Sequence, residues 1–229
     1  MSTAILNSST ATGFRTAKRI QESALATAEK RALIWMAERT PERTNSDHLT
    51  ILGFIAQLAT GGCYALARFN RFWLAASIAC LALNWLGDSL DGTLARVRQK
   101  QRPRYGFYVD HILDSIGAPA LMGGLAASGY MSPAVAASLL VMFLLLSIQS
   151  YLATYTLGEF RMSFWGFGPT ELRVLLVAGN LALFRWPWVL HGRKLFDVGG
   201  IAGIVGMSAM LVFFTVRNIR RLYNEERIA

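Results

Sequence analysis

Four aspartates lie close together in a chain that is otherwise very apolar. Asp88 and Asp91 are three residues apart, Asp110 and Asp114 are four residues apart, and residues 49–157 contain no other acidic side chain. Both spacings place the two carboxylates of a pair on one face of a helix. Carboxylates this close stay ionised together only when cations join them, and hard divalent cations prefer such oxygen ligands. The sequence therefore predicts a Mg²⁺ site that can bridge to substrate phosphates.

Small and basic residues flank the aspartates. Gly92 and Gly106 have no side chain, so a ligand can approach their backbone closely. Ala95 is small and follows Asp91 by one helical turn, and Arg96 can pair with a phosphate oxygen. These residue types suit a site that binds a phosphorylated substrate.

The segments that must position these residues are hydrophobic enough to cross a membrane. The chain has 229 residues, of which 53% are hydrophobic, and a bilayer span needs about 20 mostly apolar residues. The sequence predicts an all-α integral membrane protein with about six transmembrane helices, in which the second and third spans carry the aspartates. The expected spans are 49–68, 72–92, 107–129, 132–157, 170–190 and 197–217.

The basic residues predict the orientation of these spans. With six spans and both termini in the cytoplasm, 18 Lys and Arg residues fall on inner segments and 5 on outer loops, as the positive-inside rule requires. The aspartates then lie at the cytoplasmic face of an inner or cell membrane. The net charge of +9 suits the anionic inner leaflet. No nucleic-acid-binding motif accompanies this charge, so we expect no nucleic-acid partner.

The N-terminal segment has a different pattern. Residues 13–40 are rich in helix-forming residues, and Pro41 would end a helix there. They predict an amphipathic helix on the inner membrane surface, although a solvated helix or a partner-binding helix would show the same pattern. We therefore divide the chain into an N-terminal segment, 1–47, and one membrane domain, 48–229. The expected apolar face comprises Phe14, Ala17, Ile20, Ala24, Ala28, Ala32 and Trp35.

Four glycines recur in the last predicted span. Small residues at such spacing allow close contact between helices. They permit either packing within the chain or a homodimer. They are Gly199, Gly200, Gly203 and Gly206.

The aspartates and their small neighbours together form a longer pattern. Its order is Asp88-x2-Asp91-Gly92-x2-Ala95-Arg96-x9-Gly106-x3-Asp110-x3-Asp114. This resembles the signature of the CDP-alcohol phosphotransferase (CDP-alcohol phosphatidyltransferase) family of membrane enzymes, and all eight fixed positions are present. The resemblance implies an enzyme of phospholipid synthesis that transfers a substituted phosphate from a CDP-linked donor to a hydroxyl acceptor and releases CMP.

The resemblance also implies roles for these residues. Asp88, Asp91 and Asp110 would ligate two Mg²⁺ (or Mn²⁺) ions, and Asp114 would share a metal ion or act as the general base. The CDP pocket would be lined by Gly92, Ala95, Arg96 and Gly106. Such ions neutralise the diphosphate and the leaving CMP, and a nearby carboxylate accepts the acceptor's proton.

Local features favour the choline/ethanolamine phosphotransferase branch, which uses a CDP-aminoalcohol and diacylglycerol. Asp110 is followed by His111, which competes with Asp114 as the base or simply orients an aspartate. Residues 149–171 resemble a loop of that branch. There Glu171 would hold a cationic head group, helped by Tyr155 or Trp165, or these residues form an ordinary interfacial belt.

The other main branch remains open. It transfers a phosphatidyl group from CDP-diacylglycerol to inositol phosphate, glycerol phosphate or serine. Arg161 and Arg173 would then bind the acceptor's phosphate, or they are ordinary positive-inside charges. Six spans also depart from the roughly ten of the eukaryotic aminoalcohol enzymes.

Three rival classes share some of these features. Membrane prenyltransferases use aspartate-rich helices and Mg²⁺, but they lack the Gly-x2-Ala-Arg element. A cation transporter would line its path with aspartates, but here they cluster at one membrane face and no internal repeat is visible. The third class is an inactive family member with a scaffold role. The complete eight-residue pattern argues against it.

Overall fold

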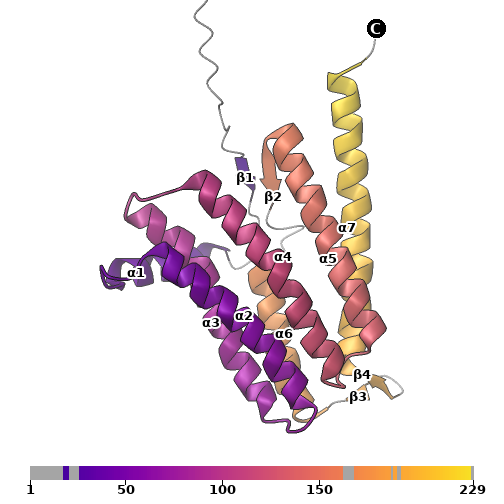
Figure 1. Cartoon of the computed structure of the whole chain (residues 1–229). Helices are drawn as coiled ribbons and strands as arrows, with labels where there is room; N and C mark the ends of the chain where they lie inside the picture. The colour runs from indigo at the N-terminus through magenta and orange to yellow at the C-terminus, as the bar shows by residue number, and fades with distance from the viewer. Residues whose placement is uncertain (1–17, 21–25, 162–167, 187, 190–191, 228–229) are drawn as a thin grey trace, which may run out of the picture.

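The protein is built mainly from helices (Figure 1). The computed structural model describes residues 18–20, 26–161, 168–186, 188–189 and 192–227. Within them, the helices are α1 Ala26–Arg39, α2 Ser46–Ala67, α3 Trp73–Val97, α4 Pro103–Ala127, α5 Pro133–Leu157, α6 Pro169–Leu183 and α7 Leu195–Glu225. Two short strands, β1 Lys18–Ile20 and β2 Glu159–Arg161, pair in parallel, and β3 Trp188–Val189 pairs with β4 Arg193–Lys194 in antiparallel fashion.

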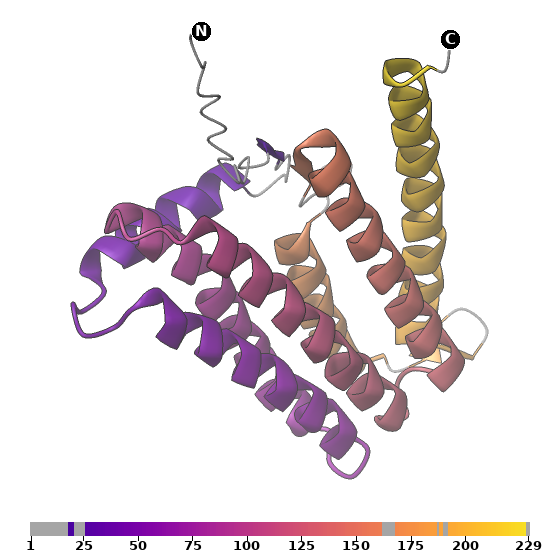
Figure 2. The same ribbon diagram turned by 45° about the horizontal axis from the view of Figure 1, so that its top comes forward.

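Helices α2 to α7 run up and down beside one another (Figures 1 and 2). One end of this bundle carries the α3–α4 loop, the β1–β2 pair and the C-terminal end of α7 (Figure 1). We call it the α3–α4 end; the β3–β4 pair lies at the opposite end. Two of the segments that the basic residues assign to the cytoplasm, the α3–α4 loop and the C-terminal end of α7, therefore lie at the same end of the bundle. That this end faces the cytoplasm remains a prediction.

The expected fold class, an all-α integral membrane protein, is confirmed. In the described part of the chain, four helices are long and apolar enough to cross a membrane: α2, α3, α5 and α7. Helix α4, which carries Asp110 and Asp114, has 25 residues but is not among these four. Helix α6 has 15 residues and ends at Leu183, short of the predicted 170–190 span. Six spans therefore remain a prediction.

The expected N-terminal helix is wrong in part. Lys18–Ile20 form a strand because their backbone pairs with β2, and such long-range pairing overrides a weak helical propensity. The helix α1 covers only Ala26–Arg39 of the predicted 13–40. Phe14, Ala17 and Ala24 of its expected apolar face lie outside the described residues.

Helix α1 has two apolar sides. Leu33 and Ala37 are buried against a cluster that includes Leu90 and Leu94 of α3. On another side, Ala28, Ala32 and Trp35 are exposed, with Trp35 at 57%. The first side attaches the helix to the bundle, and the second leaves an aromatic residue available to a membrane surface.

Glycines let α2 lie very close to both aspartate-bearing helices. A Cβ atom at Gly87 of α3 would lie 2.5 Å from the backbone nitrogen of Gly53 in α2. A Cβ atom at Gly124 of α4 would lie 2.0 Å from the carbonyl oxygen of Gly61 in α2. No real side chain fits at such distances. Helix α2 is thus the common support on which α3 and α4 bring their carboxylates together.

The glycines of α7 lie partly against α5. A Cβ atom at Gly200 would lie 2.5 Å from Cγ1 of Val135, and one at Gly203 would lie 3.3 Å from Cδ2 of Leu139. These two positions therefore serve packing within the chain. A homodimer remains a prediction.

A buried polar group attaches α6 to α2 and α3. The side-chain amide of Asn180 donates to the hydroxyl of Tyr64 at 3.0 Å and to that of Ser77 at 2.9 Å. All three side chains are fully buried. Unpaired polar groups are costly in an apolar interior, so these bonds fix the C-terminal half of α6.

Candidate active site

The loop between α3 and α4 is held by basic residues. Gln99 has a positive φ of 54° where α3 ends, and Pro103 begins α4, a position where proline is favourable. The guanidinium of Arg98 donates to the carbonyl oxygens of Thr40 at 2.8 Å and Pro41 at 3.0 Å. The loop and the connection before α2 are therefore fixed to each other at the α3–α4 end.

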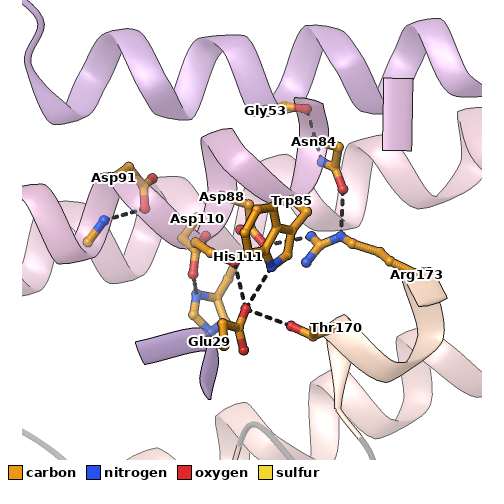
Figure 3. Close-up of polar contacts among 12 residues, drawn as sticks. Glu29, Gly53, Asn84, Trp85, Asp88, Asp91, Asp110, His111, Thr170 and Arg173 are labelled. Atoms are coloured by element: carbon orange, nitrogen blue, oxygen red, sulfur yellow. Dashed lines mark hydrogen bonds and ion pairs between the residues drawn. The ribbon is translucent and has the colours of Figure 1, made fainter. Parts of the chain in front are cut away.

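Three of the four aspartates form a close cluster. Asp88 of α3 and Asp110 and Asp114 of α4 each place a carboxylate oxygen within 4.8 Å of the others, and Figure 3 shows Asp88 and Asp110 side by side. All three are half-buried. Such an oxygen-only donor set suits a hard divalent cation. A pocket beside it is lined by Thr50, Gly53, Phe54, Gln57, Asn84, Asp88, Asp91, Asp110, Leu113 and Asp114.

Asp91 lines the same pocket but lies outside the close cluster. Its Oδ2 accepts a hydrogen bond from the Thr50 hydroxyl at 2.6 Å, and its Oδ1 faces the backbone N–H of Gly92. Three residues span less than one helical turn, so Asp91 is rotated from Asp88 towards α2. All four expected aspartates therefore line one pocket, but only three of them form the close cluster.

Arg173 places a cation beside this cluster. Its Nη2 lies 2.5 Å from Oδ2 of Asp88, and its Nε donates to Oδ1 of Asn84 at 2.8 Å (Figure 3). The side-chain amide of Asn84 donates in turn to the Gly53 carbonyl at 3.0 Å. The arginine side chain is only 15% exposed. Helix α6 thus contributes a fixed positive charge to the pocket that α3 and α4 form.

The expected donor-binding residues lie between the aspartates and the α3–α4 loop. Apart from the neighbouring residues and the local helix backbone, no described heavy atom lies within 4 Å of a Cβ atom placed at Gly106. At Gly92 only Nη1 of Arg96, on the same helix, does so, at 3.6 Å. Arg96 is exposed and donates to the Thr93 hydroxyl at 3.0 Å. Ala95 is half-buried. A ligand can therefore reach the backbone of both glycines.

His111 lies among aromatic rings. It stacks on Phe107 with ring centroids 4.2 Å apart, and it meets Phe160 at 4.8 Å and Tyr151 at 5.1 Å edge to face. Its Nδ1 lies 2.7 Å from the Phe107 carbonyl oxygen and 3.5 Å from a carboxylate oxygen of Asp110. The carbonyl can only accept, so Nδ1 carries a proton in this contact.

The other expected head-group residues are not brought into the aspartate cluster. The carboxylate of Glu171 accepts from the backbone N–H of Gly168 at 2.9 Å, which stabilises the start of α6. Tyr155 is 90% exposed on α5. The backbone of Arg161 belongs to β2, and its side chain lies outside the described part of the structure, as does Trp165.

Several residues of the site were not identified from the sequence. Thr50 and Gln57 of α2 and Asn84 of α3 line the pocket, and all are polar side chains within apolar spans. Such residues are functional candidates in a membrane protein, so a signal for them existed. Glu29 of α1 contacts α3 and α6, and its type and spacing gave no such signal.

Comparison with known proteins matches the sequence to one family. A family model described as CDP-alcohol phosphatidyltransferase matches residues 43–216. The fold is similar to that of Mycobacterium tuberculosis phosphatidylinositol phosphate synthase (PgsA1), solved with CDP-DAG bound, with a TM-score of 0.56. The two chains share 19% identity over 90% of this chain and 98% of that chain. No curated protein matches the sequence.

Proposed function

We propose, because the chain belongs to the CDP-alcohol phosphatidyltransferase family, that it transfers a phosphatidyl group from CDP-diacylglycerol to the hydroxyl of a phosphorylated polar alcohol. The protein is a membrane enzyme that transfers phosphate groups, as its eight-residue pattern predicted. The donor is CDP-linked. The lipid nature of the donor and the phosphate on the acceptor are the proposal.

The position of Arg173 carries this proposal. A guanidinium has five N–H donors, and the contacts with Asn84 and Asp88 use two of them. Further donors can therefore bind a phosphate oxygen that approaches the aspartate cluster. A choline or ethanolamine head group offers these donors no acceptor oxygen. Glu171, the expected partner of such a head group, is engaged with the start of α6.

CDP-diacylglycerol fits the surroundings of the pocket. Its acyl chains can stay in the bilayer beside the apolar helices while its diphosphate enters at the α3–α4 end. Gly92, Ala95, Arg96 and Gly106 would line the pocket for the cytidine diphosphate. The related fold of the synthase solved with CDP-DAG bound supports this choice of donor.

The aspartates would hold the metal ions. We assign Asp88, Asp110 and Asp114, with Asp91 beside them, to one or two Mg²⁺ or Mn²⁺ ions, because their oxygen ligands suit hard cations. A bound cation would neutralise the diphosphate and the departing CMP.

We assign the role of general base to Asp114. The acceptor's hydroxyl oxygen would attack the phosphorus that bears diacylglycerol, and the bond from that phosphorus to the CMP oxygen would break. The hydroxyl proton would pass to Asp114, a member of the cluster. His111 is held by the Phe107 carbonyl and three aromatic rings, which suits a residue that positions the helix turn bearing Asp110.

The site would face the cytoplasm. Both termini would then lie on the cytoplasmic side of an inner or cell membrane. CDP-linked donors and phosphorylated alcohols would reach the α3–α4 end from the cytoplasm. The excess of basic residues on that side supports this orientation.

CMP release by the purified enzyme in nanodiscs tests the substrates. The donors are CDP-diacylglycerol, CDP-choline and CDP-ethanolamine. The acceptors are glycerol 3-phosphate, inositol phosphate, inositol, serine and diacylglycerol, and mass spectrometry identifies the lipid product. We expect turnover with CDP-diacylglycerol and a phosphorylated alcohol. Turnover with inositol or serine alone would contradict the role of Arg173 as a phosphate ligand.

A CDP-aminoalcohol phosphotransferase is the second candidate. The adjacent Asp110 and His111 in the sequence favour it, as does the resemblance of residues 149–171 to that branch. It predicts CMP release from CDP-choline or CDP-ethanolamine with diacylglycerol. That outcome in the same assay would replace the proposed donor and acceptor.

A further inference from the structure

Glu29 joins the N-terminal helix to two helices of the site. One carboxylate oxygen, Oε1, accepts from the Trp85 indole N–H at 2.8 Å, the Thr170 hydroxyl at 2.8 Å and the Ser89 hydroxyl at 3.3 Å. Trp85 and Ser89 lie on α3, before and after Asp88 in the sequence. Thr170 lies in the first turn of α6, and Figure 3 shows it and Trp85 directed towards Glu29.

The first half of α6 depends on such polar contacts. The fully buried residues of this helix, Asn180 and Leu183, lie in its second half. In the first half, Leu172, Val174 and Leu175 are between 39% and 58% exposed. Among the described residues, apolar packing therefore contributes little to holding this end of α6. In the described part of the chain, polar contacts connect it to α3: Thr170 is linked through Glu29, and Arg173 contacts Asn84 and Asp88.

We infer that Glu29 is a positioning residue, which holds the first turn of α6 against α3 so that Arg173 stays beside the aspartates. The inference rests on the proposed function, because it takes Arg173 to bind the phosphate of the acceptor. The three donors to Glu29 are neutral groups. The link between α6 and α3 therefore requires an acceptor oxygen at position 29, and the negative charge of Glu29 is secondary.

Kinetics of matched variants test this inference. In Glu29→Ala we expect the KM for the phosphorylated acceptor to rise about tenfold, the effect of losing roughly one hydrogen bond. The KM for CDP-diacylglycerol and kcat should change by less than about threefold. Glu29→Gln keeps the oxygen and should stay within about threefold of the wild type. Glu38→Ala, at an exposed acid on the same helix, is the control.

Variants of the α6 partner test the same link from the other side. Thr170→Val removes the hydroxyl and keeps the shape, so it should raise the acceptor's KM as Glu29→Ala does. Thr170→Ser keeps the hydroxyl and should behave like the wild type. These variants decide the question if Glu29→Ala does not fold.

Hydrogen–deuterium exchange gives a readout that needs no turnover. Amide exchange in the first turns of α6 should be faster in Glu29→Ala and Thr170→Val than in the wild type, Glu29→Gln or Glu38→Ala, because the link to α3 is lost. A wild type without CMP release would contradict the proposed function, and exchange would still decide the role of Glu29.

Two results would overturn the inference. Equal losses in Glu29→Gln and Glu29→Ala would show that the charge acts, for example on a cationic ligand. Unchanged acceptor KM and unchanged exchange in a folded Glu29→Ala would show that α6 is held without this residue.

Discussion

The four carboxylates differ in their surroundings although they share one pocket. Three converge within 4.8 Å, whereas Asp91 is held by Thr50 on α2. Like charges at this spacing repel unless cations lie between them. Removing one carboxylate should therefore affect metal binding and turnover far more than folding, since the helices are held by contacts elsewhere.

Asp91→Asn tests whether Asp91 belongs to the metal site. The amide retains an acceptor for the Thr50 hydroxyl but loses the charge, so we expect CMP release to fall by at least about 10²-fold. Folding and part of the CDP-donor binding should remain, as thermal unfolding and donor titration would show. Glu42→Gln, an exposed acid in the connection before α2, is the control. A fully active Asp91→Asn enzyme would remove this residue from the metal site.

The two candidate bases can be separated by a pair of variants. Asp114→Asn should reduce kcat by about 10²- to 10⁴-fold, the usual contribution of a general base, combined with its loss as a metal ligand. His111→Phe keeps an aromatic ring among Phe107, Tyr151 and Phe160 and should retain more than about a tenth of kcat. Initial rates at saturating substrates measure both. The reverse order of effects would make His111 the base.

Arg173 should set the affinity for the acceptor. Hydrogen bonds to charged groups contribute about 1.5–3 kcal/mol, so Arg173→Ala should raise the KM of a phosphorylated acceptor about 10- to 100-fold. Arg173→Lys restores charge without the planar fork and should recover part of the loss. Arg185→Ala, at an exposed arginine near the opposite end, is the control. An effect confined to the donor's KM would assign Arg173 to the donor instead.

At the scale of elements, α2 determines how closely α3 and α4 approach. Gly53 and Gly61 of α2 face Gly87 and Gly124 of the two aspartate helices. Small residues on facing helices allow such contacts in membranes, where packing is a main attraction between helices. A side chain added at one of these places would separate the carboxylates that the cluster needs.

Gly124→Ala tests the support that α2 gives to α4. The added methyl group would meet the Gly61 carbonyl, and overpacking of this kind costs about 1–3 kcal/mol. We expect a lower unfolding temperature in detergent and reduced turnover. Gly123→Ala is a matched control on the same helix, since no described heavy atom outside the local helix lies within 4 Å of its added methyl. Equal unfolding temperatures in the two variants would contradict the close approach.

Part of this arrangement was predictable from the sequence. The spacing of Asp88, Asp91, Asp110 and Asp114 placed them on two neighbouring helices, and the structure gathers them in one pocket. The approach of α6 was not predictable, because Arg173 follows Asp88 by 85 residues and reads as an ordinary cytoplasmic charge. Glu29 was missed for the same reason. The strand at Lys18–Ile20 depends on a partner far along the chain, which local propensity cannot reveal.

At the scale of the whole molecule, charge separates the two ends of the bundle. The α3–α4 loop and the C-terminal end of α7, which are both rich in basic residues, lie at the α3–α4 end (Figure 1). An anionic inner leaflet attracts such an end. The orientation of the enzyme in the membrane therefore determines the side from which its substrates reach the site.

Single introduced cysteines can determine this orientation. In intact cells, a membrane-impermeant thiol reagent should label Arg193→Cys in β4, at the end opposite the site. It should label Gln101→Cys in the α3–α4 loop only after the membrane is opened. Both positions are exposed, and the wild type measures labelling of Cys63 and Cys80. Labelling of Gln101→Cys in intact cells would reverse the topology.

We propose that the aspartates of α3 and α4 form a metal-dependent site that cleaves a CDP-linked lipid. The most direct measurement is CMP release from CDP-diacylglycerol with a phosphorylated alcohol, by wild type and Asp88→Asn in nanodiscs. We expect turnover by the wild type that EDTA abolishes and Mg²⁺ restores, and none above background in the variant. Turnover by folded wild type that is unchanged by EDTA, or equal turnover by Asp88→Asn, would contradict the claim.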